Sequence, residues 1–594
     1  MKNRKITILA GLVEQRFLSF VRTPSRYIGG EINAIKKDLD KCGLRVALCF
    51  PDIYEIGMSH TGLAIVYEAL NRLPNVAAER VFLPWTDAQE IMKQKNIPLF
   101  TLESKAKVAD FDILGFSLTN ELCYTSVLNA LDLAGIPLRS KDRNDDFPLI
   151  LGGAGMANCC EPVAEFFDMF LLGQAEEASV QLAQFLIEQK KTNTPKQNIL
   201  IEAAKKFPFI YVPSLYKFEY NGLKIKSFTL IDNGLPERIT DAVVDDLDNS
   251  VVLESPIVPF TQAIHERISI EVMRGCPGRC NFCQASFCRR PVRYRSPQRI
   301  LEIAKKAYHS TGLDTIGLLS LSTADYPYLE ETISLLNEYF EPRRVGISLP
   351  SLRVDVQLKL LPKLASSVRK SGLTIAVEAA SERLRKIINK PITDENLFAA
   401  VEEAYKQGFE SIKLYFMAGL PTETEEDIKN IVKLCYDLAI LRKKVCGKVA
   451  NINAAVSWFV PKTHTPFGWQ GQQSEEYFKN VKDIILAEKR KLNAGFLNFK
   501  FHNIHASLLE SAIGRGDRRL ADVIECAYRS GARFDLWDEC FRFDLWQKAF
   551  EKCGLNLNKL AARKFDVDEI LPWQHLGGPD KQYLLKQLEK TAEK

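Results

Sequence analysis

The stretch RISIEVMRGCPGRCNFC, residues 267–283, joins a short apolar strand pattern to a loop that carries three cysteines. Glycine and proline interrupt the pattern directly after the strand and predict a loop. Three and then two residues separate the cysteines, so a loop of this kind lets three sulfur atoms point at one centre. The cysteines are Cys276, Cys280 and Cys283.

This cysteine spacing favours a metal centre over buried thiols. Three close thiolates without a nearby fourth ligand fit a cubane iron–sulfur cluster that leaves one iron open. A closed structural zinc site normally needs four ligands. Cys288 lies five residues after Cys283 and could be that fourth ligand, so zinc stays open as an alternative.

The cysteine stretch opens a series of six apolar strand candidates that alternate with helical segments. This alternation predicts an open or partial barrel of parallel strands, with ligands at the C-terminal strand ends. We expect the barrel at residues 263–480, with a helix that begins at Ser296 and has Pro297 in its first turn. The strand candidates are residues 267–273, 315–321, 345–350, 373–378, 411–417 and 452–459.

A second region of alternating strands and helices precedes the barrel. Its apolar strands include residues 45–52, 112–119 and 148–153, the last of which ends in glycines. Such alternation indicates a parallel, doubly wound sheet, which we place at residues 44–195. The predicted fold is therefore α/β, a Rossmann-like domain followed by a partial (β/α)6 barrel.

Three further segments complete the predicted organisation. Residues 1–43 look mainly helical. Residues 196–262 contain YKFEYNGLKIKSFTL (216–230), which predicts a hairpin with Asn-Gly at its turn and hence a small β connector. Residues 481–594 are rich in helix formers and aromatics, and predict a mainly helical C-terminal region.

The composition is that of a soluble globular protein with several domains. The chain has 594 residues, of which 46% are hydrophobic and 26% charged, and its net charge is +5. The 14 cysteines are mostly scattered singly, and neither a signal peptide nor an uninterrupted apolar run of membrane-spanning length is recognisable. We therefore expect a cytoplasmic protein without a membrane partner.

The cysteine motif and its place after the first barrel strand resemble the radical S-adenosylmethionine superfamily. Phe282, directly before the last cysteine, matches the aromatic residue usual there. The resemblance implies a [4Fe-4S] cluster whose open iron chelates the amino and carboxylate groups of S-adenosylmethionine. It also implies an external one-electron donor, such as flavodoxin or ferredoxin, whose electron breaks the sulfonium to a 5′-deoxyadenosyl radical.

The same resemblance implies that side chains at the other strand ends hold S-adenosylmethionine. The Gly-Gly-Glu sequence frequent in the superfamily is absent, and several candidates could equally be helix caps or surface ion pairs. After the fifth strand we expect a capping box from Thr422 to Glu425. The candidate residues are Ser320, Ser322, Arg353, Glu378, Ser381, Arg383 and Gly419.

The front domain resembles the cobalamin-binding domain of a large radical subgroup, and within it an uncharacterised family. Cobalamin domains that bind cobalt through a histidine usually carry the sequence Asp-x-His-x-x-Gly. The comparable loop of this chain has only His60 and Gly62. We therefore expect cobalamin to bind without a histidine ligand; a degenerate dock for substrate or partner is the alternative. The candidate cobalamin residues are Ser117, Gly152, Gly153 and Gly173.

Together these resemblances imply a cobalamin-dependent methyltransferase of unidentified substrate, for which an RNA or ribosomal component stays open. Methylthio transfer or cyclisation without methyl transfer is one alternative, and an RNA- or ribosome-binding protein with a structural cluster is another. The C-terminal motif HNIHASLLESAIGRGDRRL (502–520) is dense in charge. It could form a substrate surface or a helix with solvated faces.

Overall fold

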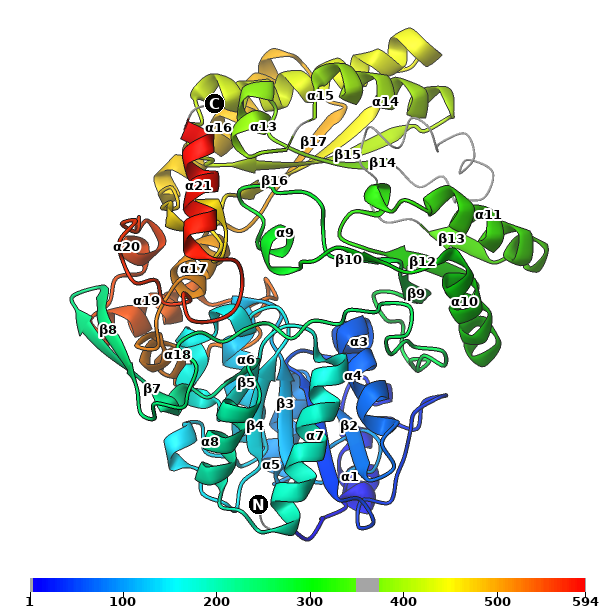
Figure 1. Cartoon of the computed structure of the whole chain (residues 1–594). Coiled ribbons are helices and arrows are strands. Elements are labelled where there is room, and N and C mark those ends of the chain that lie inside the picture. The colour runs from blue at the N-terminus through cyan, green and yellow to red at the C-terminus, as the bar shows by residue number, and fades with distance from the viewer. Residues whose placement is uncertain (1–3, 349–372, 391, 593–594) are drawn as a thin grey trace.

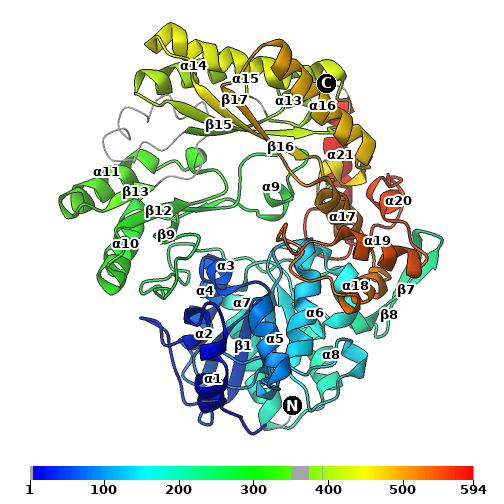
Figure 2. The same ribbon diagram turned by 180° about the vertical axis from the view of Figure 1, so that it is seen from behind.

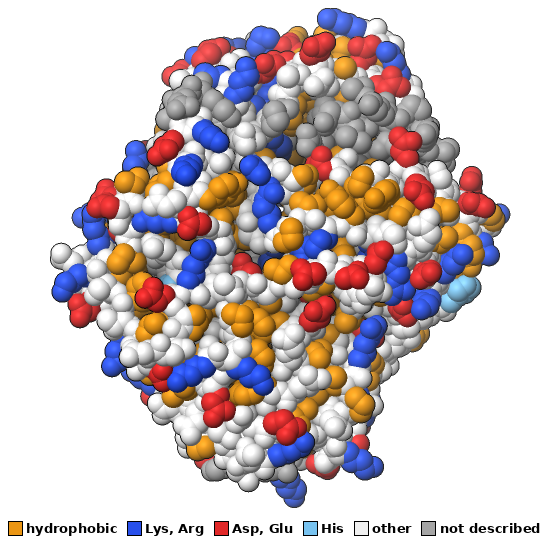
Figure 3. All heavy atoms as spheres, in the orientation of Figure 1, with side chains coloured by type: hydrophobic (Ala, Val, Ile, Leu, Met, Phe, Trp, Pro, Cys, Tyr) orange, Lys and Arg blue, Asp and Glu red, His pale blue; other side chains and the backbone are white. Residues whose placement is uncertain are grey.

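The computed structural model describes residues 4–348, 373–390 and 392–592. A doubly wound domain and a barrel-like domain lie one above the other, with the C-terminal helices along one side of both (Figure 1). On the face shown in Figure 3, acidic and basic side chains are interspersed with apolar ones. No helix in the described ranges is long and apolar enough to cross a membrane.

The N-terminal domain is built on a six-stranded sheet of order β2-β1-β3-β4-β5-β6, and the first five strands are parallel. Helices cover both faces, α4 (Thr61–Asn71) and α7 (Ala175–Lys191) on one and α5 (Thr86–Gln94) and α6 (Tyr124–Leu133) on the other (Figures 1 and 2). This confirms the doubly wound fold. The strands are β1 Leu44–Phe50, β2 Val76–Phe82, β3 Ile113–Ser117, β4 Leu149–Gly153, β5 Met169–Leu171 and β6 Ile210–Tyr211.

The predicted end of this domain at residue 195 was too early. Helix α8 (Lys196–Lys206) leads into β6, which pairs antiparallel with β5 and so closes the sheet edge. The chain that follows does form the predicted hairpin, from β7 (Tyr216–Asn221) and β8 (Lys224–Leu230). Its two-residue turn is Gly222–Leu223, one position later than the predicted Asn-Gly, with Gly222 at φ +57°.

The barrel domain contains all six predicted strands, in two parallel sheets of order β13-β12-β9 and β14-β15-β16-β17. Helix α10 (Pro297–Thr311) begins as predicted, since Ser296 accepts a hydrogen bond from the Arg299 backbone. The predicted end at residue 480 was wrong because β17 pairs with β16. The strands are β9 Ile268–Glu271, β12 Thr315–Leu319, β13 Gly346–Ser348, β14 Leu373–Glu378, β15 Ser411–Ala418, β16 Asn451–Trp458 and β17 Leu497–Phe501.

The two ends of the chain differ in how much helix they form. The described part of the N-terminal lead has only short helices, α1 (Ala10–Arg16) and α2 (Ser25–Ile28), so the expectation of a mainly helical lead was wrong. After β17 the chain is mainly helical, as expected. Its helices are α17 Ile504–Gly514, α18 Leu520–Arg529, α19 Phe543–Lys552, α20 Leu557–Ala561 and α21 Lys581–Ala592.

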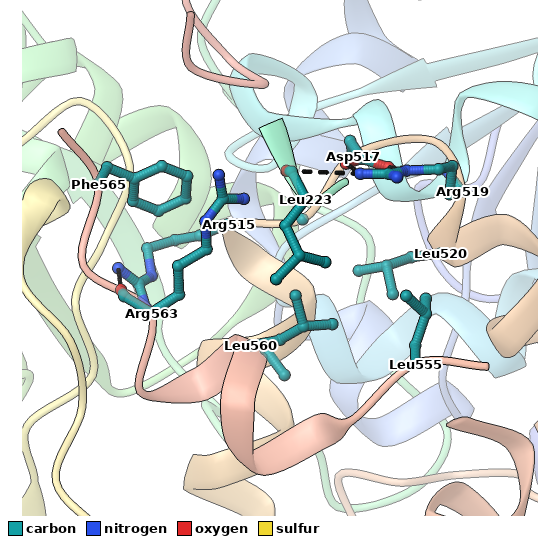
Figure 4. Close-up of a pocket in the computed structure, with 11 residues that line it drawn as sticks. Leu223, Arg515, Asp517, Arg519, Leu520, Leu555, Leu560, Arg563 and Phe565 are labelled. Atoms are coloured by element: carbon teal, nitrogen blue, oxygen red, sulfur yellow. Dashed lines mark hydrogen bonds and ion pairs between the residues drawn. The ribbon is translucent and has the colours of Figure 1, made fainter. Parts of the chain in front are cut away.

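Two arginines of the C-terminal motif join distant parts of the chain. Buried Arg515 donates hydrogen bonds to backbone carbonyls, including Ala561 at the end of α20 (2.9 Å) and Gly468 (3.2 Å). In Figure 4 it lies beside Phe565 at a pocket of about 20 Å³, room for one water molecule. Arg518 pairs with buried Glu161 of the N-terminal domain (2.9 Å). Both arginines therefore bind other segments of the protein itself.

Candidate active site

A cavity of about 590 Å³ lies where the two α/β domains meet. The C-terminal strand ends of the N-terminal sheet form one wall, through Ser117, Gly153 and Gly173. The opposite wall comes from the barrel, through Gly275 beside the cysteine loop and Ser320 at the end of β12. The cavity therefore connects the candidate cobalamin edge with the first barrel strands.

The cysteine loop is held in a defined shape by backbone contacts. Gly275 has φ +90°, and a Cβ there would lie 2.4 Å from the carbonyl oxygen of Arg289, so only glycine fits. Arg290 then closes the loop: its Nη2 donates to the Gly278 carbonyl (2.8 Å) and its Nε to the Ser286 carbonyl (2.9 Å). Short helix α9 (Gln284–Cys288) follows the last motif cysteine.

The three motif cysteines are partly exposed on this loop. A Cβ at Gly278 would stand 3.3 Å from the Cys276 Sγ and 4.0 Å from the Cys280 Sγ, so both sulfurs lie beside this glycine. Burial raises the pKa of Cys276, and raises the pKa of Cys280 to about 12 although Lys390 acts in the opposite sense. Metal binding at this loop would therefore release protons.

The sequence alternative of a four-cysteine zinc site concerns Cys288. Burial raises the pKa of this thiol strongly, and it lies at the end of α9. Within the described ranges, no three His, Cys, Asp or Glu side chains gather closely enough to hold a single metal ion. This holds for the three motif cysteines alone as well as for sets that include Cys288, so the described side-chain positions favour neither ligand set.

The candidate residues after β12 form a hydroxyl-rich turn. The Ser320 and Thr323 hydroxyls are 2.8 Å apart, and Ser322 donates to Asp325 Oδ2 (2.6 Å). Of the two candidate serines, Ser320 lines the cavity. Arg353, the candidate after the third strand, lies outside the described residues.

Glu378 ends β14 close to the cysteine loop. Its Oε1 lies 2.9 Å from the Nζ of Lys390, and both charges influence the pKa of Cys280 after burial, which is the largest effect. Glu378 has φ +68° and sits at a register shift of the strand. A left-handed backbone at a non-glycine residue is a strained conformation that often marks a functional site.

Ser381, Arg383 and Gly419 make contacts within the protein. Ser381 caps α13 (Glu382–Ile387) and donates to Asp427 Oδ1 (2.6 Å), and Arg383 pairs with the same carboxylate. The predicted capping box was two residues off, because Thr424 and Asp427 form it at the start of α15 (Glu425–Cys446). A Cβ on Gly419 would approach Phe478 to 2.7 Å, so packing requires this glycine.

The candidate glycines of the N-terminal domain serve different purposes. A Cβ on Gly152 would approach the Phe170 ring to 2.4 Å, and one on Gly173 would approach the Ala242 backbone equally closely. A Cβ on Gly153 would meet no atom nearer than 3.9 Å. Gly153 is therefore the glycine at this strand end whose missing side chain leaves space in the cavity.

His60 also lines the cavity, at the start of α4. Its Nδ1 accepts a hydrogen bond from the Leu63 backbone N–H (3.0 Å), and burial lowers the pKa of the imidazole to about 4. The ring is therefore neutral at pH 7 and carries its proton on Nε2. A metal-binding histidine needs a free nitrogen lone pair, and its other nitrogen usually donates a hydrogen bond.

An ion network that the sequence did not reveal connects the two walls. Arg274, two residues before Cys276, lies 2.6 Å from Glu176 of α7 and 2.6 Å from Glu271. It also donates to Gln174 Oε1 (3.0 Å). No local signal in the sequence identifies Arg274 as the partner of Glu176.

Models of known protein families match parts of both α/β domains. The family model described as "Radical SAM proteins, N-terminal" matches residues 62–213. The model of the "Radical SAM superfamily" matches residues 270–435, which include the three motif cysteines.

Curated relatives match over different lengths. The uncharacterized protein MJ0966 of Methanocaldococcus jannaschii is 26% identical over 483 residues, covering 81% of this chain and 90% of that protein. A probable threonylcarbamoyladenosine tRNA methylthiotransferase of Archaeoglobus fulgidus is 29% identical over 168 residues, only 26% of this chain and 39% of its own length.

Among solved structures, the fold is similar to that of the radical S-adenosylmethionine methyltransferase TsrM from Kitasatospora setae, with cobalamin and a [4Fe-4S] cluster bound. The TM-score is 0.50 at 12% identity, and the match covers 86% of this chain and 99% of that one. At this identity the similarity concerns the fold alone.

Proposed function

Since the chain belongs to the radical S-adenosylmethionine superfamily, we propose that it catalyses cobalamin-dependent methyl transfer to a substrate that enters the interdomain cavity. The observation that carries this proposal is the cavity itself, because it joins the glycine-rich edge of a cobalamin-type domain to the cysteine loop. A methyl carrier and a cleavage centre must share one chamber for this chemistry.

Each wall would hold one group. The cluster, bound by the three motif cysteines, would supply the electron that cleaves S-adenosylmethionine, delivered by an external donor such as flavodoxin or ferredoxin. Bound cobalamin would supply a methyl carrier. The residues proposed to hold S-adenosylmethionine are Ser320, Ser322, Arg353, Glu378, Ser381, Arg383 and Gly419, and those proposed for cobalamin are Ser117, Gly152, Gly153 and Gly173.

The chain's own residues would position these groups and exclude water. Arg290 keeps the cysteine loop closed, and Arg274 ties that loop to Glu176 across the cavity. The ion network would thus fix the distance between the two walls, as group transfer requires. His60 would remain a helix cap and not a cobalt ligand, because its Nδ1 lone pair is already used and its Nε2 is protonated.

Filling the space at Gly153 tests the cavity assignment. Gly153→Phe would project a ring into the cavity without a left-handed backbone to strain. We expect loss of hydroxocobalamin retention after anaerobic reconstitution, with cluster iron unchanged. Gly495→Phe, at an exposed glycine with open space around it, is the matched control. Equal retention of cobalamin by wild type and Gly153→Phe would argue against cobalamin in this cavity.

Methylthio transfer is the second candidate function. It is favoured by partial similarity to several methylthiotransferases, at 25–29% identity over 26–28% of this chain. Those matches cover at most 39% of each relative. Sulfur incorporation into the product, which cobalamin-dependent methyl transfer does not give, would identify this alternative.

A further inference from the structure

Arg289 is a positive charge in the cavity wall whose guanidinium has no partner among the described residues. It follows α9, six residues after Cys283, and lines the cavity. Across the described residues its guanidinium makes no hydrogen bond or ion pair, although its neighbour Arg290 is fully engaged with the cysteine loop. An arginine without a carboxylate partner beside a cavity presents its fork of N–H donors to whatever enters.

The other charges of the cavity wall are compensated. Arg274 lies between Glu271 and Glu176, with 2.6 Å contacts to both. His60 is neutral because its Nδ1 accepts a hydrogen bond in a buried setting. Among the described residues, Arg289 is therefore the charged group of the wall that forms no ion pair.

The wall opposite Arg289 offers further donors. The turn after β4 passes through Ala154, with φ +73°, and Gly155. The N–H groups of both residues have no hydrogen-bond acceptor in the described chain. The Arg289 Nη2 lies 3.6 Å from the position a Cβ on Gly155 would take, so the guanidinium faces this turn. Successive free N–H groups in such a turn form a concavity that binds anions.

We infer that Arg289 and the Ala154–Gly155 turn form an oxyanion site, which binds a carboxylate or phosphate group of the molecule in the cavity. This site rests on the proposed function, which identifies the cavity as the reaction chamber. It assigns the substrate to the carboxylate- or phosphate-bearing compounds, unless cobalamin's own phosphate occupies the site. The shared chemistry is an oxyanion between a guanidinium and two backbone N–H groups.

The first test measures, by calorimetry, the affinity of the 594-residue chain with its cluster reconstituted for inorganic phosphate. We expect Arg289→Gln to weaken phosphate binding roughly tenfold or more, the loss of a charge-assisted hydrogen bond. Arg289→Lys keeps the positive charge but loses the forked pair of N–H donors. Its phosphate affinity should lie between those of wild type and Arg289→Gln. Arg16→Gln removes an exposed arginine outside the cavity and should bind like wild type. Equal affinity of wild type and Arg289→Gln would overturn the site, provided that all variants retain cluster iron.

The second test separates the two sources of the oxyanion. Phosphate binding is repeated on protein saturated with hydroxocobalamin or with cobinamide, which lacks the nucleotide phosphate. Phosphate binding that persists with hydroxocobalamin supports a substrate oxyanion. Competition by hydroxocobalamin alone supports the cofactor phosphate. Competition by both would mean that the corrin covers Arg289, which overturns an oxyanion site in the loaded enzyme. Failure to bind cobalamin contradicts the proposed function but leaves the first test valid.

Discussion

Among single residues, Cys280 has the most informative surroundings. Burial raises the pKa of its thiol, while the Lys390 ammonium favours the thiolate, and Glu378 pairs with that same lysine. Cys288, at the end of α9, is partly exposed like the motif cysteines, and burial raises the pKa of its thiol strongly. The spacing of the motif cysteines therefore favours them over Cys288 as metal ligands.

Single cysteine replacements test this difference. Cys276→Ala, Cys280→Ala and Cys283→Ala should each reduce bound iron from about four atoms per chain to nearly none, because a cubane with one open iron needs all three thiolates. Cys288→Ala serves as the matched control and should retain full iron. Iron and sulfide analysis after anaerobic reconstitution measures this. Full iron in Cys280→Ala, or its loss in Cys288→Ala, would contradict the assignment.

Asp535, in the stretch GARFDLWDE (531–539), provides a pH test of how the C-terminal region packs. It accepts hydrogen bonds from Thr125 of α6 (2.5 Å) and Trp546 of α19 (3.1 Å), and burial raises its pKa from 3.8 to about 6. A raised carboxyl pKa means that the folded state binds the proton more tightly. Stability from this group is therefore full below about pH 4 and is lost as pH rises to about 6.

Asp535→Asn should remove this pH dependence, because its amide cannot ionise. Between pH 5 and 7.5, the melting temperature of the wild-type apo chain should fall relative to the variant by roughly 2–4 °C. Thermal denaturation followed by circular dichroism measures the difference. Parallel pH profiles for the two proteins would show that Asp535 is not buried as described.

At this scale the sequence predicted residue types better than residue roles. Cysteine spacing is local, so the loop was recognisable from Cys276 to Cys283. The space around a glycine depends on side chains elsewhere in the chain: a Cβ on Gly152 would meet Phe170, and one on Gly419 would meet Phe478. Both glycines remain proposed ligand contacts, but these packing neighbours are set by tertiary structure and were not predictable from the sequence.

Among the elements, strand β2 escaped prediction because of its charges. Glu79 and Arg80 lie in the middle of β2, which interrupts the apolar run expected of a buried parallel strand. Arg80 is compensated inside the protein, because it pairs with Glu31 (2.8 Å) and Glu103 (2.6 Å), both from outside the strand. Arg80 can be buried in a strand because its partners come from other segments. The strand therefore lacks the continuous apolar pattern by which a buried strand is recognised in a sequence.

Arg80→Met tests how far β2 depends on this network. The replacement leaves two buried carboxylates without their cation, a loss of about 3–5 kcal/mol for a broken buried pair. Arg72→Met, which removes an exposed pair with Glu68 on α4, should cost less than about 1 kcal/mol. Melting temperatures of both variants measure the contrast. Equal shifts would contradict the buried network.

Helix α4 carries the test of cobalamin coordination. His60→Ala removes the helix cap and should destabilise the chain by about 1 kcal/mol. The visible spectrum of retained hydroxocobalamin should nevertheless match that of wild type, because the imidazole offers no free lone pair to cobalt. A spectral shift in His60→Ala would identify His60 as a ligand and contradict this geometry.

For the whole molecule, domain limits were the least predictable feature. Both domains extend past their predicted ends, because β17 pairs with β16 and because β6, which follows α8, pairs with β5. The cavity is equally non-local, since Ser117 and Ser320 on opposite walls are some 200 residues apart in the chain. Sequence could indicate both walls but not that they face each other.

If cobalamin relays the methyl group to a carbon radical, as proposed, each turnover uses two molecules of S-adenosylmethionine, one as methyl donor and one as the source of the radical. The decisive measurement quantifies S-adenosylhomocysteine and 5′-deoxyadenosine in anaerobic incubations with reductant, cell extract and methyl-labelled S-adenosylmethionine, with and without cobalamin. With cobalamin, we expect both nucleosides and a methyl-labelled product. Without cobalamin, S-adenosylhomocysteine and the labelled product should be absent. Cys280→Ala should form no 5′-deoxyadenosine. 5′-Deoxyadenosine without cobalamin-dependent S-adenosylhomocysteine would contradict methyl transfer, and absence of both would contradict the radical reaction.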